Sequence, residues 1–295
     1  QKDGAAVLLP LSAAQPIRIQ SGDVSVSYDK SKGEGWTAKI VAYGLDRDDF
    51  RASALDLTAS GRITPDLFGA TVAFTGEGLE PRDAATARAL GSFVAGDAVL
   101  YYHKGEGGLA IPKLRLQGED YNASATGARV AGLADALTLT GKVSAELEDL
   151  SRFAPLAKAP LGGVARAEIT GSFSPLTGAF DLATRTVGQD LRSGQILLDR
   201  LLTGQTEVSG HLRRDQSGTR LTDGKILGNG VDAGVSGVIS STASDLTAQV
   251  QMPDLSVLGP GFGGALQANA QLKGPLSGAA ITATATGQSL RVGNA

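Results

Sequence analysis

An internal repeat is the sequence feature that most constrains the fold of this chain. Segments 89–194 and 198–293 pass through the same order of turn motifs, at an offset of about 100 to 110 residues. The matched positions are Gly96 with Gly204, Gly108 with Gly218, Gly127 with Gly237, Asp149-Leu150-Ser151 with Asp254-Leu255-Ser256, Gly178 with Gly278, and Leu191-Arg192 with Leu290-Arg291. Such a chain adds like units along one axis, and each unit packs on its neighbours. We therefore divide it into a loosely matched β-repeat segment, 1–88, and repeat units 89–194 and 198–293 of one continuous elongated β-structure.

Short runs of alternating apolar and polar residues indicate what each repeat is made of. Examples are Val24, Val26 and Tyr28; Leu55, Leu57 and Ala59; Val143, Ala145 and Leu147; and Leu246, Ala248 and Val250. A period of two gives a strand one dry face and one wet face. The runs end in turn-forming stretches such as GRITPDLFG, DGKILGNG and LKGPLSG, at spacings of about 8 to 12 residues. We expect roughly two dozen short antiparallel strands.

Three stretches break the alternation and predict short helical turns. They are PRDAATARALGSF from Pro81, DLSRFAPLAKAP from Asp149 and GQDLRSGQILLDRLLTG from Gly188. In each, apolar residues recur three or four positions apart, which is the spacing of a helix face. The predicted fold class is therefore all-β: an elongated, curled antiparallel repeat sheet with a few short helical turns.

Composition narrows the functional classes. The chain has 40 Gly, no Cys and only 5% aromatic residues, so small and branched aliphatic side chains must form its apolar surfaces. Its net charge of −3 comes from nearly balanced acids and bases, and nucleic acid is not an expected partner. No stretch approaches the roughly 20 apolar residues of a membrane-spanning helix. The chain ends inside a strand-like pattern, and we expect it to be a segment of a longer protein.

The dry faces of the predicted strands are the candidate binding surface. A curled sheet too thin to fill its own interior leaves an apolar groove that suits lipid acyl chains. The positions expected to line this groove are Leu114, Leu116, Leu137, Leu139, Val143, Leu147, Ile169, Leu182, Ile226, Val235, Leu246, Val250 and Ile281. The same positions would also suit the core of a closed β-sandwich, and the pattern fits both arrangements equally.

The repeat resembles the TamB family of Gram-negative bacteria, within the AsmA-like, bridge-type lipid-transfer proteins. The resemblance lies in the cycle DLSRFAPLAKAPLGG with SPLTG, and DLSVLGPGFGG with GPLSG, each closed by an LRxG-type ending. It covers residues 89–295 well and 1–88 loosely. It implies a taco-like β-groove, a periplasmic location, an inner-membrane anchor outside this chain, and a role in phospholipid transport, outer-membrane biogenesis or protein secretion. An outer-membrane assembly partner is implied only for regions outside this segment.

The sequence gives little support for catalysis or metal binding. His103 and His211 are the only histidines and lack metal-ligand spacing, so no metal or cofactor is expected. GPGFGG at Gly259 lacks the Lys-Ser/Thr of a phosphate-binding loop and predicts a turn before a strand. Asp46, Asp48 and Asp49 lack the ligand spacing of a calcium loop. We therefore expect a protein that is not an enzyme.

Two other readings stay open. A β-repeat adhesin or structural stalk would also explain turn-rich strands, but it would have a filled core. A carbohydrate-active β-enzyme would need paired carboxylates in a cleft. Glu146 and Glu148 alternate with apolar residues, which is typical of the solvated face of a strand.

Overall fold

The computed structural model describes residues 7–9, 17–105, 108–132, 137–240, 243–275 and 278–293. These residues form two compact units. Unit 1 comprises Gln1–Ala145 with Pro155–Lys158, and unit 2 comprises Glu146–Ala154 with Ala159–Ala295. The division falls inside the predicted repeat unit 89–194, within a strand and a short helix. The boundary between the two units therefore does not coincide with the boundary between the two sequence repeats.

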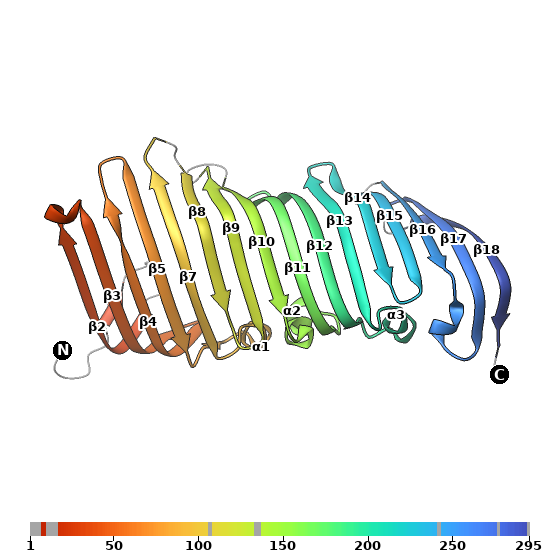
Figure 1. The fold of residues 1–295 in the computed structure, drawn as a ribbon, viewed down its shortest axis with the longest axis horizontal. Helices are drawn as coiled ribbons and strands as arrows, with labels where there is room; N and C mark the ends of the chain where they lie inside the picture. Colours follow the sequence, from red (N-terminus) through yellow and green to blue (C-terminus); the bar gives the residue numbers. More distant parts are fainter. Residues whose placement is uncertain are drawn as a thin grey trace. The chain divides into compact units, whose positions relative to one another are not determined.

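In unit 1 the strands follow one another side by side in chain order (Figure 1). They are β1 (Val7–Leu9), β2 (Ile17–Asp29), β3 (Gly35–Arg47), β4 (Phe50–Ile63), β5 (Leu67–Glu77), β6 (Glu80–Pro81), β7 (Phe93–His103), β8 (Gly108–Gln117) and β9 (Tyr121–Ala131). A 3-10 turn, η1 (Lys30–Lys32), joins β2 to β3, and helix α1 (Ala84–Leu90) precedes β7. The pairings from β1 to β9 are antiparallel, and β6 is a short extra partner of β4.

Unit 2 repeats this plan. Its strands are β11 (Gly162–Ser174), β12 (Ala179–Arg192), β13 (Gln205–Asp215), β14 (Gly218–Gly228), β15 (Val231–Ile239), β16 (Ser244–Met252), β17 (Phe262–Gly274) and β18 (Ala280–Val292). Each pairs antiparallel with the next. Helix α3 (Ile196–Leu201) precedes β13, and the 3-10 turns η2 (Leu150–Phe153) and η3 (Leu255–Leu258) precede β11 and β17. Strand β10 (Thr138–Leu147) and helix α2 (Ala154–Ala157) run across the division between the units.

The predicted all-β fold class is confirmed, because the described residues form a curled, unclosed antiparallel sheet with a few short helices. The predicted strand number is wrong, since the described residues form eighteen strands rather than roughly two dozen. Several Gly positions that predicted turns lie inside long strands. The Asp223-Gly224 pair is an example: it forms an irregularity within β14, where Asp223 has φ 52° and the register shifts between Leu221 and Gly224.

Both halves of the sequence repeat follow one sequence of elements. α1 and β7 to β12 correspond to α3 and β13 to β18, with η2 and η3 in matching places. Matching bulges support the correspondence. Gly163 in β11 and Gly264 in β17 have φ 95° and 89°, and each faces a non-glycine residue at positive φ, Asp190 at 51° and Ser289 at 52°. A Cβ on either glycine would lie within 2.6 Å of a backbone carbonyl oxygen of the partner strand.

The Asp-x-Ser turns match in atomic detail as well. Asp149 accepts hydrogen bonds from the Ser151 backbone N–H and hydroxyl, both at 2.8 Å. Asp254 accepts the equivalent pair from Ser256 at 2.8 and 2.7 Å. These carboxylates satisfy N–H groups at the start of a 3-10 turn, which explains why the motif recurs just where a strand gives way to η2 or η3.

Candidate functional site

The apolar face of unit 2 runs across all its strands. Residues that pair directly between antiparallel strands point to the same side, so the register sorts every side chain onto one of two faces. On one face β11 to β18 contribute mainly Ala, Val, Ile, Leu and Phe. Its larger members are Ile169, Phe173, Phe180, Leu182, Val208, Leu212, Leu221, Ile226, Val235, Leu246, Val250, Met252, Leu266, Leu272 and Ile281.

Two rows of small residues form the floor of this face between β15 and β18. One row is Val235, Ala248, Ala270 and Ala283, and the next is Ala233, Val250, Ala268 and Ala285. Larger residues flank the floor: Leu246, Leu272 and Ile281 on one side, and Met252 with Leu266 on the other. The rows run across the strands, and four strands span about 14 Å. The surface is therefore a shallow track at right angles to the strands.

Unit 1 has a corresponding apolar face with larger side chains. Register places Trp36, Ile40, Leu57, Phe68 and Phe74 on one side of β3 to β5. The face continues on β2, β7, β8 and β9 through Val24, Val26, Tyr28, Ala98, Leu100, Tyr102, Leu114, Leu116, Ala123 and Ala125. The rings of Trp36 and Phe68 stack with centroids 5.7 Å apart.

Strand register places nine of the thirteen sequence-predicted lining residues on these faces. In unit 1 they include Leu114 and Leu116 on β8. In unit 2 they are Ile169, Leu182, Ile226, Val235, Leu246, Val250 and Ile281. The remaining four lie in or just before β10. Leu139, Val143 and Leu147 are separated by even numbers of residues in that strand, and Leu137 directly precedes it. That they contact lipid stays a prediction.

Sequence reasoning missed several members of the same faces, among them Val208, Leu212, Leu266 and Leu272. Val208 and Leu212 lie in EVSGHLR before Arg214, where Gly interrupts the alternation, and pairing such as that of Leu182 with Leu212 identifies them only once the register is known. Leu266 and Leu272 lie in the regular run ALQANAQLK, whose alternation could have identified them.

No layer of side chains covers either apolar face among the described residues. Among all the described residues, the buried apolar ones are seven alanines (Ala42, Ala52, Ala70, Ala89, Ala125, Ala165 and Ala233) together with Met252 and Leu255. Larger members of the faces remain open: Val24 and Ile281 are each 71% exposed, and Phe173 is 40% exposed. A two-layer β-sandwich would bury these side chains against a second sheet. Within each unit these larger side chains therefore lack a covering layer of described residues.

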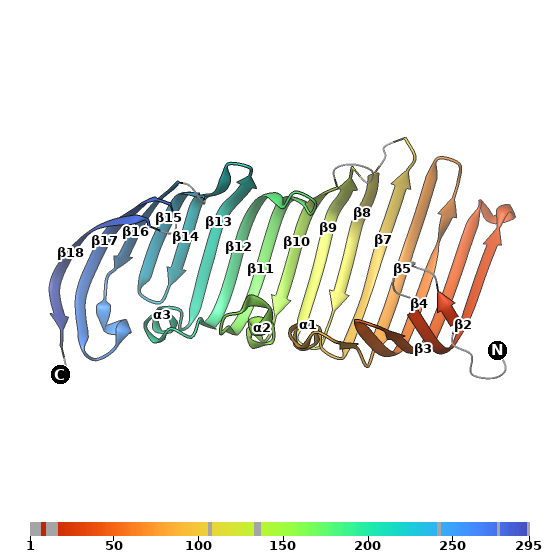
Figure 2. The ribbon, with the colours of Figure 1, turned by 180° about the vertical axis from the view of Figure 1, so that it is seen from behind.

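One margin of each apolar face is closed. We call the strand ends next to α1, α2, α3, η2 and η3 the helical margin, and the opposite ends, where η1 lies in unit 1, the hairpin margin (Figures 1 and 2). At the helical margin a glycine of the apolar face is overlain by a leucine three positions further along the chain. A Cβ on Gly188 would lie 2.5 Å from the Leu191 side chain, and one on Gly287 would lie 2.3 Å from Leu290. Gly76 with Leu79 repeats the arrangement in unit 1.

Helix α3 completes this closure in unit 2. Its last turn lies over the end of β13 and β14, where Thr206 is fully buried and donates its hydroxyl to the Leu202 carbonyl. The Arg200 guanidinium donates to the Leu258 carbonyl at the end of η3, and so ties the two helical segments together. The hairpin margin has no comparable cover among the described segments.

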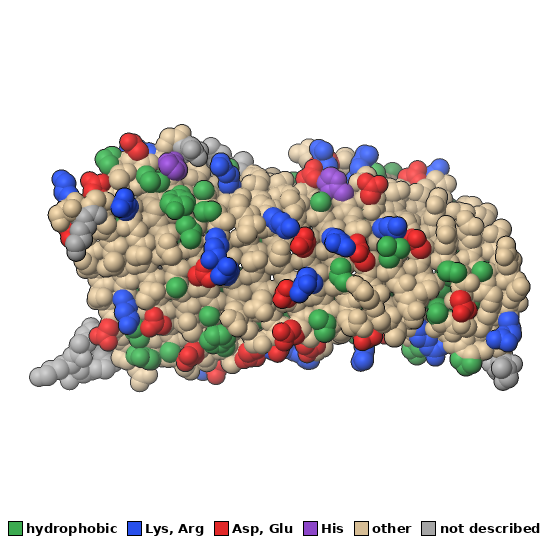
Figure 3. Space-filling model, viewed as in Figure 1, with side chains coloured by type: hydrophobic (Ala, Val, Ile, Leu, Met, Phe, Trp, Pro, Cys, Tyr) green, Lys and Arg blue, Asp and Glu red, His purple; other side chains and the backbone are tan. Residues whose placement is uncertain are grey.

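The opposite face of each sheet is polar and ion-paired. Figure 3 shows acidic and basic side chains lying next to one another along the strands. In unit 2 Arg185 donates two hydrogen bonds to Glu207, at 2.8 and 2.9 Å, and this holds the pKa of the Glu207 carboxyl below its usual range. In unit 1 Lys113 pairs with Asp97 at 3.5 Å. Charges that neutralise one another suit a face that stays in water.

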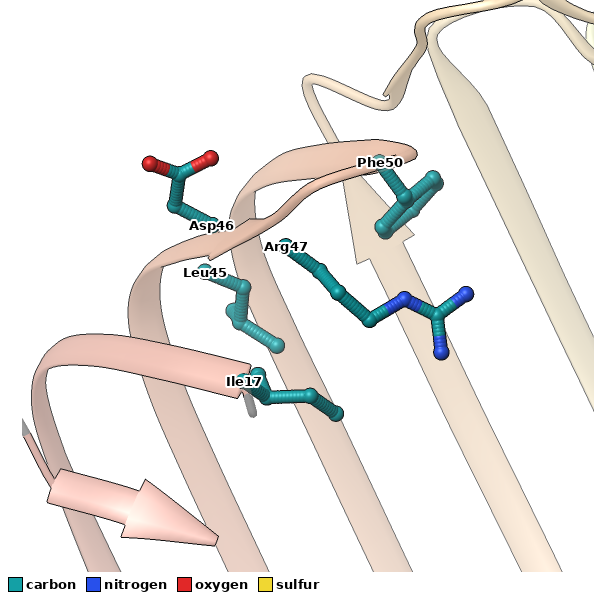
Figure 4. Close-up of a pocket in the computed structure, with 5 residues that line it drawn as sticks. All are labelled: Ile17, Leu45, Asp46, Arg47 and Phe50. Carbon is teal, nitrogen blue, oxygen red and sulfur yellow. The ribbon is translucent and has the colours of Figure 1, made fainter. Parts of the chain in front are cut away.

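A small hollow lies where β2, β3 and β4 begin or end in unit 1 (Figure 4). Ile17, Leu45, Asp46, Arg47 and Phe50 line it. Figure 4 shows the Asp46 carboxylate turned away from the Leu45 and Arg47 side chains. The Arg47 guanidinium donates hydrogen bonds to Asp49, and this pairing lowers the pKa of the Asp49 carboxyl. The hollow is therefore lined by apolar side chains and by the Arg47 guanidinium, whose charge Asp49 neutralises.

Several acidic residues and one histidine considered as possible ligands or catalytic groups instead pair with neighbouring side chains. Asp46 pairs with Arg51 at 3.2 Å and with Arg82 at 3.7 Å. His211 contacts Asp181 on the polar face, and Glu146 pairs with Arg166 at 2.8 Å. Gly259 ends η3 in a turn that leads into β17, as predicted.

In the part of the chain that the structure describes, His, Cys, Asp and Glu side chains nowhere gather in threes that could hold a metal ion. Across the same residues, each helix is too short or too polar to cross a membrane.

Comparisons with protein-family models, curated proteins and solved structures found no match. The functional argument therefore depends on the geometry of the two faces.

Proposed function

We propose that this chain is a non-enzymatic lipid conduit segment that holds phospholipid acyl chains on its apolar faces. The observation that carries the proposal is the uncovered apolar face of each unit, which contrasts with an ion-paired opposite face. Each methylene removed from water is worth about 0.8 kcal/mol, so an acyl chain of about 14 methylenes gains on the order of 10 kcal/mol when it is fully removed from water, and a smaller part of this where one side of the chain stays exposed. Small apolar side chains bind the acyl chain without holding it at one point, so the lipid can move along the surface.

We further propose a periplasmic setting between inner and outer membranes, as the resemblance to the TamB family implies. Phospholipid would be the cargo, and outer-membrane biogenesis would be the process served. An adhesin or stalk is less well supported, because such a protein has no use for an apolar face without a covering layer.

Photocrosslinking tests the proposal with a matched control within one strand. A photoreactive residue replaces Val250 on the apolar face of β16, or its neighbour Gln249 on the polar face. We expect crosslinked phospholipid, identified by mass spectrometry after expression in a Gram-negative host, from position 250 and not from 249. Probes at Leu139 and Val143 extend the test to β10. Equal labelling from both faces of β16, or no lipid from either, would contradict the proposal.

A further inference from the structure

Among the residues that the structure describes, one basic side chain lies on the apolar face of unit 2. Arg214, near the end of β13, lies directly opposite Phe180 of β12 and Thr219 of β14. Leu212, two residues before it, pairs with Leu182 and Leu221 in the next row. Arg214 therefore occupies the row closest to the hairpin margin, immediately above a row of three leucines.

Arg214 is exposed, and the ion pairs and side-chain hydrogen bonds among the described residues leave it without an acidic partner. The nearby carboxylates are engaged elsewhere. Asp181 contacts His211 and, at 4.0 Å, Arg213. Asp215 accepts hydrogen bonds from Ser217 and lies 3.6 Å from Arg213. No carboxylate shares the row, which continues through Phe173, Phe180, Thr219 and Ile239.

This position suits the phosphate of a lipid. A guanidinium binds a phosphate through two parallel hydrogen bonds, and its methylene stem covers apolar surface while the charge stays at the water boundary. The helical margin is closed by aliphatic side chains and α3, so a headgroup has its way to water at the hairpin margin. Arg213 and Arg220 of the same hairpin point to the polar face and cannot serve.

We propose that Arg214 binds the phosphate of a phospholipid whose acyl chains lie on Leu182, Leu212 and Leu221. The proposal rests on the lipid-binding function proposed above and adds an orientation to it: the headgroup lies at the hairpin margin and the tails point toward the helical margin. Phosphate-bearing lipids are thereby favoured over neutral lipids that have the same tails.

The test compares two tail-labelled ligands, phosphatidylglycerol and diacylglycerol, in detergent-exchange binding measurements on the full chain. Arg214→Met keeps the apolar stem and removes the charge. Arg220→Met removes a charge from the polar face of the same hairpin and is the matched control. Circular dichroism verifies that each variant is folded. We expect Arg214→Met to weaken phosphatidylglycerol binding roughly tenfold and to leave diacylglycerol binding unchanged, with no change for Arg220→Met.

Unchanged phosphatidylglycerol binding by Arg214→Met, or an equal loss for both ligands, would overturn the role of Arg214 while leaving lipid binding intact. Failure of the unsubstituted chain to bind either ligand would overturn the proposed function itself, and the phosphate site with it. Raised salt gives a second readout: it should weaken phosphatidylglycerol binding by the unsubstituted chain and have little effect on Arg214→Met.

Discussion

The apolar faces of units 1 and 2 rest on the same strand pairing but are filled differently. In unit 1 large rings stand on the sheet, with Trp36 stacked on Phe68 and the Phe74 ring lying over Gly96. In unit 2 the apolar face across β15 to β18 is floored by alanine rows such as Ala248, Ala270 and Ala283. Strand register fixes where an apolar face forms, while side-chain volume sets how much room is left on it. We therefore expect unit 2 to hold more hydrocarbon per strand than unit 1.

The largest difference should appear at two glycines that match in the sequence repeat, Gly127 of β9 and Gly237 of β15. Gly237 has φ 139°, and a Cβ there would lie 2.0 Å from the Asp245 carbonyl oxygen. Gly127 has φ 59° with no atom within 4 Å of the corresponding Cβ position. In urea titrations we expect Gly237→Ala to lower the free energy of unfolding by about 3 kcal/mol or more. Gly127→Ala should lower it by about 1 to 2 kcal/mol. Equal losses would mean that the two strands are not built differently.

A bulky residue on the alanine floor tests whether unit 2 supplies the room for lipid. Ala270→Trp places an indole on the floor of the track, whereas Gln271→Trp puts the same group on the polar face of β17. Displacing about two methylenes of ligand costs roughly tenfold in affinity. We expect that loss of bound phospholipid, measured by mass spectrometry, for Ala270→Trp alone. A similar loss for Gln271→Trp would show that the faces are not distinct.

Removing an aromatic contact should affect unit 1 more than unit 2. Phe68 and Phe173 are 36% and 40% exposed on their respective apolar faces, but only Phe68 stacks on Trp36 among the described aromatic pairs. We expect Phe68→Leu to cost about 1 kcal/mol more than Phe173→Leu in urea unfolding. Trp36 fluorescence should shift only in Phe68→Leu. Equal costs would assign no stabilising role to the stacked pair.

The smallest effect concerns pH and should appear in both units. Hydrogen bonds lower the pKa of Glu207, Asp215 and Asp254 in unit 2, and those of Asp49 and Asp83 in unit 1. A carboxyl whose pKa is lowered by folding stabilises the fold above its unfolded pKa, and the stabilisation is lost as the pH falls through the folded value. Hydrogen exchange near these carboxyls should therefore speed up slightly in each unit as the pH falls from 7 to 3. Slower exchange in either unit at the lower pH would contradict this assignment.

Much of the fold could be predicted from sequence because a strand with one dry face needs only a period of two. The short helices after Pro81, Asp149 and Gly188 were also recognisable from apolar spacing, and α1, η2 with α2, and α3 all lie within the predicted stretches. Glycine caused the error in strand number, since at Gly163 and Gly224 it forms irregularities inside a strand rather than turns between strands.

The candidate site was only partly accessible to sequence reasoning. Alternation identifies Leu246 and Val250 as members of a dry face, but it cannot tell which residues of other strands stand beside them. Arg214 shows the limit. In the sequence it is one of three arginines around a polar turn, and only pairing with Phe180 and Thr219 places it on the apolar side.

Each row of the alanine floor contains one residue from each of four strands. Whether these residues face the lipid side therefore depends on whether a strand gains or loses an even or an odd number of residues. A one-residue insertion at the start of β16 would turn Ala248 and Val250 toward water and bring Thr247 and Gln249 onto the floor. A two-residue insertion would restore the pattern with a shifted register. Descendants of this sequence should therefore tolerate insertions and deletions in the turns and, within strands, accept them chiefly in even steps.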